Sequence, residues 1–207
     1  MSVAEHVKQS LKGGEWLIHE SQPAETFIPE EFTEEQQMIR SMCAQFLETE
    51  VFPIIERIDS LEQGLMPSLV KKTGELGLLS TSIPEEYGGV GLGMVAASVI
   101  LEEIHHQGCN AAACHAQMYT MGTVLRHGSD EQKKEYLPKI ADGTLRLQAF
   151  GVTEPTSGTD TTSLRTVAVR DGDDYVINGQ KIWTSRAEHS DLMLLLARTK
   201  PLNQVSK

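Results

Sequence analysis

The spacing of hydrophobic residues changes from a helical to an alternating period near Leu145, and this change constrains the fold most. Residues 94–106 and 111–127 are low in charge and rich in Ala, Met and β-branched residues, which is typical of helices buried on more than one side. After Leu145, short apolar stretches alternate with turn sequences. The chain is therefore expected to be an α+β protein, with an all-α part followed by strands.

Helix start and stop signals divide the first part of the chain. The capping-box spacing of Thr33-Glu-Glu-Gln36 predicts an amphipathic helix that ends or bends near Pro53. A shorter helix is expected to begin at Pro67. Ser129-Asp-Glu-Gln132 predicts another capped helix, which stops before Asp142-Gly143.

The second part reads as strands joined by tight turns. A strand is expected over residues 145–152, and Asp171-Gly-Asp-Asp174 predicts an antiparallel hairpin. Residues 192–197 form an apolar run short enough for a buried strand. So few strands leave unpaired edges and half a core, so more chain or a second polypeptide is expected. We predict three regions: an arm (1–31), an all-α domain (32–144) and an incomplete antiparallel β domain (145–207).

Charge and composition exclude several classes of protein. A formal charge of -11 argues against a nucleic-acid surface, and no apolar run approaches the ~20 residues of a membrane span. Three cysteines without a secretory leader indicate a reducing compartment, and no transit peptide is recognised. We therefore expect a cytoplasmic protein of bacterial type rather than a mitochondrial matrix protein. His105 and Cys109 fit no tight zinc pattern, so no metal is expected.

Two polar segments carry the strongest indication of a ligand. Residues 150–160 leave a strand and form a loop rich in small hydroxyl residues, where Gly158 would allow a ligand close to the backbone. Residues 181–186 place the indole of Trp183 next to two hydroxyls, which suits a flat aromatic ligand with polar edges. The alternative is a plain connection in which Glu154 and Asp160 accept hydrogen bonds from turn amides, with Trp183 a half-buried core residue.

A series of motifs identifies a family. They are Ile83-Pro-Glu-Glu-Tyr-Gly-Gly89, Gly128-Ser-Asp-Glu-Gln132, Tyr136-Leu-Pro138, Val152-Thr-Glu-Pro155, Gly158-Thr-Asp160 and Asn178-Gly-Gln-Lys-Ile-Trp183. In this order and spacing they resemble the N-terminal and middle domains of the acyl-CoA dehydrogenases, from about Phe32 to Lys200.

This resemblance implies FAD-dependent α,β-dehydrogenation of acyl-CoA thioesters to trans-2-enoyl-CoA, as in the β-oxidation of fatty or branched acyl groups. Electrons would pass to an electron-transferring flavoprotein, and the full-length protein would be a homotetramer or homodimer. The catalytic base of the family is a Glu in a C-terminal helical domain, which would lie beyond Lys207. No catalytic residue is therefore assigned within this chain.

The resemblance also assigns cofactor contacts. Phe150 matches an aromatic position at the flavin, and Val152 and Thr153 match residues that bind the pyrimidine edge of the isoalloxazine ring. Trp183 matches an indole that packs on the flavin ring. Ser185 matches a hydroxyl residue near flavin N5.

Three further positions concern the phosphates and the substrate. Thr159 matches a Ser that lies between the FAD pyrophosphate and the acyl-CoA chain, and it keeps the hydroxyl. Thr156 stands where the family usually has Gly. Arg186 stands where Asn is common, and beside a flavin it could stabilise the reduced anion or bind a phosphate.

Two alternatives stay open from the sequence. An acyl-CoA oxidase, which uses O₂ as electron acceptor, is hardly separable from a dehydrogenase by these motifs. A non-catalytic interaction protein, or a fragment with no function of its own, would also retain the helical surface while lacking the base.

Overall fold

A computed structural model describes residue 11 and residues 13–200, and it divides the chain into two compact units, residues 1–38 and 39–207. The expectations for residues 1–10, 12 and 201–207 lie outside the described residues. Among the described helices, none has the length and hydropathy needed to cross a bilayer.

The first unit contains an arm of short helical turns. The turns are η1 (Glu15–Leu17), η2 (Pro23–Glu25) and η3 (Pro29–Glu31). The carboxylates of Glu25 and Glu31 accept hydrogen bonds from backbone N–H groups three residues earlier, at 2.8 and 3.1 Å. The Phe27 and Phe32 rings lie 5.6 Å apart, so the arm is ordered by local contacts.

The predicted helices are present, with small shifts at their ends. Their bounds are α1 (Glu34–Phe46), α2 (Ile55–Asp59), α3 (Leu65–Glu75), α4 (Gly93–His106), α5 (Ala112–His127) and α6 (Asp130–Ala141). Beyond α1 the chain continues as a π-turn, η4 (Leu47–Val51), and a 3₁₀ turn, η5 (Phe52–Ile54). This confirms the predicted bend, because Pro53 lacks the N–H that a continuous α-helix requires.

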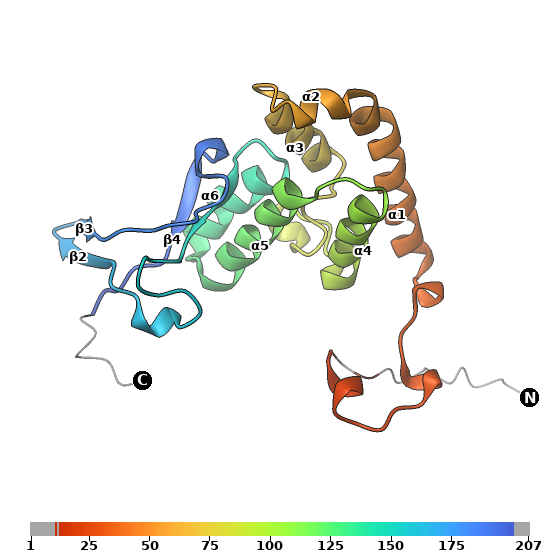
Figure 1. Cartoon of the computed structure of the whole chain (residues 1–207), viewed down its shortest axis with the longest axis horizontal. Coiled ribbons are helices and arrows are strands. Elements are labelled where there is room, and N and C mark those ends of the chain that lie inside the picture. The colour runs from red at the N-terminus through yellow and green to blue at the C-terminus, as the bar shows by residue number, and fades with distance from the viewer. Residues whose placement is uncertain (1–10, 12, 201–207) are drawn as a thin grey trace, which may run out of the picture. The chain divides into compact units, whose positions relative to one another are not determined.

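Helix α5 links the helical part to the first strand (Figure 1). It packs against α3 and α6 and against β1 (Leu147–Gly151). Gln117 is fully buried, and its side-chain N–H donates to the carbonyls of Ile140 and Leu145 at 3.0 and 2.8 Å. The hydroxyl of Thr120 donates to the Leu147 carbonyl. Side chains of α5 therefore fix the point at which the helical period gives way to strand.

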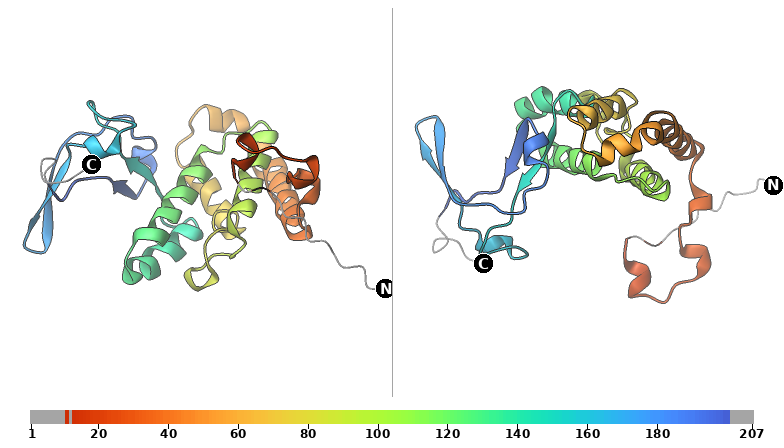
Figure 2. Two further views of the ribbon diagram at one scale, coloured as in Figure 1. Left: turned by 90° about the horizontal axis from the view of Figure 1, so that it is seen from below. Right: turned by 45° about the horizontal axis from the view of Figure 1, so that its top comes forward.

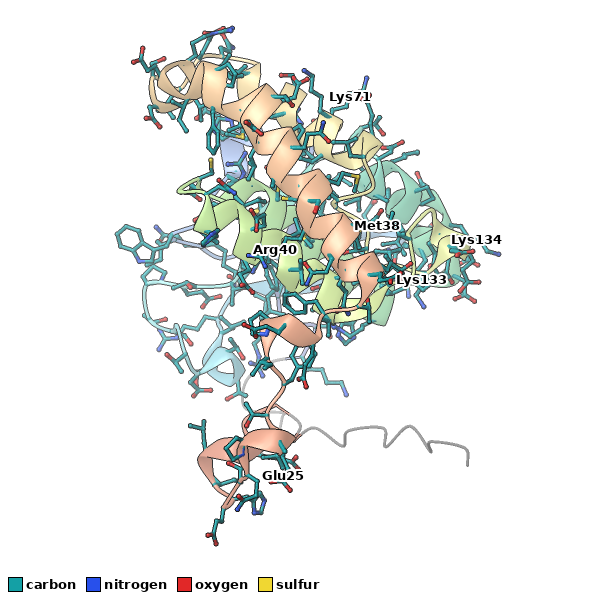
Figure 3. All side chains as sticks on the ribbon, turned by 90° about the vertical axis from the view of Figure 1, so that its right-hand side faces the viewer. Glu25, Met38, Arg40, Lys71, Lys133 and Lys134 are labelled. Carbon is teal, nitrogen blue, oxygen red and sulfur yellow. The ribbon has the colours of Figure 1, made fainter. Side chains whose placement is uncertain are left out.

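An ion pair joins α1 to α4 within the second unit. Arg40, labelled on α1 in Figure 3, donates from Nε to the buried carboxylate of Glu103 at 2.8 Å. The other carboxylate oxygen accepts a hydrogen bond from Gln107 at 2.7 Å. Burial would raise the pKa of Glu103, but these donors outweigh it and hold that pKa below its usual value.

The glycines of the motif at 83–89 have distinct structural roles. Gly88 follows the turn η6 (Glu85–Tyr87) with a φ of 79°, a left-handed conformation that glycine adopts at little cost. A Cβ on Gly89 would lie 2.0 Å from the carbonyl oxygen of Ile83. The second glycine is therefore required by a close backbone approach.

The strands form two separate pairs. The hairpin of β2 (Val167–Asp171) and β3 (Asp174–Asn178) is antiparallel, with Asp171 opposite Asp174 as predicted. In contrast, β1 and β4 (Leu192–Leu195) pair in parallel, so the expectation of antiparallel pairing was wrong for these two. The connection between them carries the whole hairpin and reaches the opposite end of the strand, which permits the parallel direction.

The prediction that residues 192–197 are buried was also wrong. Leu192 and Met193 are 41% and 48% exposed, and every residue of β3 is exposed. Figure 2 shows the hairpin extending away from the helices. Each described sheet has only two strands, and burial is confined to β1, which packs against α5, so alternation and apolar character do not bury β3 or the start of β4.

Candidate functional site

The two polar segments singled out in the sequence lie together. The backbone N–H of Ile182 donates to the carbonyl of Thr153 at 2.9 Å. The ammonium of Lys181 donates to the Val152 carbonyl at 2.8 Å and to the Glu154 carboxylate at 3.0 Å. Residues 180–184 make these contacts as irregular chain. The loop after β1 and the segment that carries the indole therefore form one structural feature.

Glu154 is the buried anchor of this feature. Its carboxylate accepts hydrogen bonds from the backbone N–H groups of Arg165 and Thr166 at 2.6 and 2.8 Å, besides the Lys181 ammonium. Burial alone would raise the pKa of Glu154, but hydrogen bonds from Thr166, Arg165 and Lys181 lower it to about 2. The carboxylate is therefore ionised at neutral pH and structural in character.

The interpretation of Glu154 and Asp160 as acceptors for turn amides is confirmed. Asp160 accepts a hydrogen bond from the backbone N–H of Thr162 at 3.1 Å, in addition to hydroxyl donors. These two carboxylates therefore stabilise the conformation of the loop through hydrogen bonds. Any ligand contact made by the loop must come from its hydroxyls and free backbone groups.

Trp183 is exposed, contrary to the alternative of a half-buried core aromatic. Its side chain is 85% accessible to solvent, and its backbone has a left-handed φ of 59°. A non-glycine residue in this conformation is uncommon and clusters at functional sites. A fully exposed indole next to the Thr153 contact offers one flat face for an aromatic ligand.

The predicted hydroxyl residues supply polar groups around this indole. In the described part of the chain, the side-chain oxygens of Thr153, Thr159 and Ser185 have no hydrogen-bond partner, although Thr153 is only half-exposed. A flavin has a flat ring system with a polar pyrimidine edge and a pyrophosphate. An exposed indole with unpaired hydroxyls on the same two segments fits such a group.

Phe150 faces the helical part. Its ring lies 6.2 Å from that of Tyr119 on α5, and Tyr119 in turn lies 5.3 Å from His115. These three rings form an aromatic row between β1 and α5. The i, i+4 spacing of His115 and Tyr119 was the only sequence signal for it.

The structure thus brings together some of the predicted residues and not others. Val152, Thr153 and Trp183 are joined through the contacts of Lys181 and Ile182. Phe150 lies on β1, before this loop, and its ring faces Tyr119 on α5. Thr159 and Ser185 are exposed on the same loops, and in the described residues no hydrogen bond connects them to that group.

Two residues have roles that sequence reasoning missed. The pairing of Glu154 with Lys181 gave no signal beyond opposite charge. Arg186, expected beside the ligand, instead donates from Nε to the side-chain oxygen of Gln148 at 2.5 Å and is half-buried with a φ of 60°. Its side chain lines a mostly apolar cavity among the helices.

Both parts of the chain match domains of one known protein family. Residues 33–144 match the N-terminal domain of acyl-CoA dehydrogenases, and residues 149–206 match the middle domain. The chain belongs to the acyl-CoA dehydrogenase family.

Relatives agree with this membership. A probable acyl-CoA dehydrogenase of Bacillus subtilis is 36% identical over 191 residues, which cover 90% of this chain and 32% of the relative. A short-chain specific acyl-CoA dehydrogenase of Clostridium acetobutylicum is 36% identical over 170 residues, covering 81% and 44%. The matched part of the chain therefore spans only 32% and 44% of the length of these two acyl-CoA dehydrogenases.

Solved structures of the family share the fold. An acyl-CoA dehydrogenase from Bacillus anthracis, complexed with FAD, has a TM-score of 0.81 and 35% identity, covering 92% of this chain and 34% of that one. A glutaryl-CoA dehydrogenase from Mycobacterium smegmatis, in complex with FADH2, has a TM-score of 0.69 and 29% identity, covering 81% and 43%.

Proposed function

We propose that this chain supplies the helical and first β part of an FAD-dependent enzyme that converts acyl-CoA thioesters to trans-2-enoyl-CoA. The observation that carries the proposal is the exposed indole of Trp183, fixed beside Thr153 by the Ile182 and Lys181 contacts. Membership of the family supports it, as do the FAD and FADH2 complexes of similar structures. The same proposal keeps the boundaries of arm, helical domain and β part at 31/32 and 144/145.

FAD, when bound, would supply the acceptor for a hydride from the β-carbon of the acyl group. The contribution of this chain is to hold the ring rigidly, because hydride transfer demands close and aligned reactants. Trp183 would cover one ring face. Val152 and Thr153 would donate hydrogen bonds to the pyrimidine edge, where charge develops on reduction, so these bonds are stronger in the reduced state.

The other predicted residues complete this arrangement. Phe150 would contact the flavin from the α5 side, Ser185 would lie near N5, and Thr159 would lie between the pyrophosphate and the acyl chain. The base that removes the α-proton would come from the part of the enzyme beyond the middle domain. An electron-transferring flavoprotein as acceptor and a homo-oligomeric assembly belong to the same proposal.

Equilibrium dialysis of FAD against the 207-residue chain tests the cofactor assignment. We expect weak but saturable binding, which Thr153→Val weakens by up to about tenfold, since a net hydrogen bond contributes about 0.5–1.5 kcal/mol. Thr49→Val is the matched control, because Thr49 lies on η4 and donates to Gln45. Folded protein that binds no FAD would overturn the proposal and favour an interaction protein.

The electron acceptor needs a second measurement on the complete enzyme. A dehydrogenase reduced by acyl-CoA should reoxidise slowly in air and rapidly with an electron-transferring flavoprotein. Rapid reoxidation by O₂ alone would instead establish an acyl-CoA oxidase.

A further inference from the structure

A cavity inside the second unit is not used by the proposed flavin site. It has a volume of about 450 Å³ and lies between α1, α3 and the junction of α4 with α5. Its lining is mostly apolar, including Phe46, Leu69 and Ile100. Cavities of about 300–1,000 Å³ with apolar walls and few polar groups are typical small-molecule sites.

Two charged residues line this cavity, and they differ in setting. Asp59 is exposed at the end of α2. Arg186 is half-buried, and its Nε is already bonded to Gln148. Among the described residues, no carboxylate forms an ion pair with Arg186. The terminal nitrogens of its guanidinium therefore lack an anionic partner.

Other groups near Arg186 bear on the energetic cost of its unpaired charge. Desolvation lowers the pKa of Arg186, the neighbouring Cys114 thiol partly offsets this, and nearby Arg146 lowers the pKa further. Arg146 itself is neutralised by Asp191 at 2.7 Å. The side-chain nitrogen of Gln148 is buried without a partner. A half-buried cation without a counter-ion is costly, and a bound anion would remove that cost.

Arg186 also lies where the apolar cavity meets a more polar one. The second cavity, about 620 Å³, is lined by the turn before α3, by Arg146 and by residues 188 and 189. The carboxylates on its wall are Glu62 and Glu188, and Glu62 is paired with Arg57 at 2.6 Å. Arg186 is thus the charged residue that lines both cavities.

The backbone conformation of Arg186 favours a functional role for its side chain. Its φ of 60° is left-handed, a conformation that Gly or Asn adopts at lower cost than Arg. An arginine therefore occupies a position that favours other residues. A binding role for the guanidinium accounts for this choice.

We propose that the cavity binds an apolar chain that ends in a carboxylate, with Arg186 as the counter-ion of that carboxylate. The ligand could be a free fatty acid or the distal carboxyl end of a dicarboxylic acyl thioester, since both present the same chemistry. The inference stands on the cavity and on Arg186, and it does not depend on flavin binding.

Calorimetric titration of the 207-residue chain tests it with decanoate and 1-decanol, which differ only in the head group. We expect decanoate to bind saturably and at least tenfold more weakly to Arg186→Asn, whose backbone suits the same conformation, whereas decanol should bind both proteins alike. Arg186→Lys should retain most of the affinity. Lys71→Gln, which removes an exposed charge on α3 (Figure 3), should bind decanoate like the wild type.

Thiol protection locates the ligand and separates its two sources. Cys109 and Cys114 line the cavity, so decanoate should slow their alkylation in the wild type and not in Arg186→Asn. A decanedioic acid mono-thioester of N-acetylcysteamine that binds better than decanoate would assign the dicarboxylic source. The reverse order would assign the free acid. Equal binding of decanoate by wild type and Arg186→Asn, or no saturable binding to folded wild type, would overturn the proposal.

Discussion

Lys181 and Glu154, 27 residues apart in the chain, form an ion pair of 3.0 Å in which both side chains are less than a tenth exposed. The same ammonium donates a hydrogen bond to the Val152 carbonyl, and the same carboxylate accepts hydrogen bonds from two backbone N–H groups. One buried pair thus fixes the loop after β1 against the segment that carries Trp183. The proposed flavin site depends on this pair, although neither residue need touch the flavin.

Removing one member of the pair should therefore destabilise the protein. Lys181→Met leaves the carboxylate buried and short of a charged donor, and we expect a loss of about 2 kcal/mol in the free energy of unfolding. Urea denaturation followed by circular dichroism measures it. Lys71→Met, at an exposed site on α3, should change stability by no more than about 0.5 kcal/mol. Equal stability of Lys181→Met and the wild type would show that the ion pair does not contribute to the free energy of unfolding.

The depressed pKa of Glu154 gives the pair a characteristic acid dependence. Because the folded pKa of about 2 lies below the ordinary 4.5, its stabilisation is full above about pH 4.5 and is lost as the pH falls toward about 2. Glu154→Gln cannot titrate. The difference in unfolding free energy between wild type and Glu154→Gln should therefore shrink across this window, measured by urea denaturation at several pH values. A difference that stays constant with pH would contradict the assigned stabilisation.

The sequence predicted the helices, strands and turns better than the pairing of the strands and their exposure to solvent. Capping boxes and Pro53 set the helix ends because these signals are local, and the Asp171–Asp174 turn set the hairpin for the same reason. The parallel pairing of β1 with β4 and the exposure of Leu192 depend on which segments meet in space. No local pattern specifies that.

The candidate site shows the same division. Its segments could be predicted because the motifs are contiguous, and their contact through Thr153 and Ile182 agrees with that prediction. The orientation of Arg186 could not be predicted, because it results from a left-handed backbone and a hydrogen bond to Gln148 on β1. Side-chain direction in irregular loops is decided by such tertiary partners.

Two helical glycines should respond to alanine in opposite directions. A Cβ on Gly74 would lie 2.3 Å from the backbone of Asp142, so Gly74→Ala must displace the loop after α6 and should cost about 1–3 kcal/mol. Gly122 on α5 has only the Arg126 side chain nearby, at 3.7 Å. Gly122→Ala should therefore stabilise the protein by up to about 1 kcal/mol, because alanine favours the helix. Thermal denaturation of both variants measures the effect, and destabilisation by Gly122→Ala would contradict the packing described around α5.

The fluorescence of Trp183 tests the central claim most directly, since that indole is proposed to lie on the flavin ring. The chain contains two tryptophans, so a Trp16→Phe background leaves Trp183 as the only indole reporter. We predict that FAD quenches most of its emission, with a midpoint equal to the dissociation constant found by dialysis. Saturable FAD binding that leaves the Trp183 emission unchanged would contradict the account, because the flavin would then lie elsewhere on the chain.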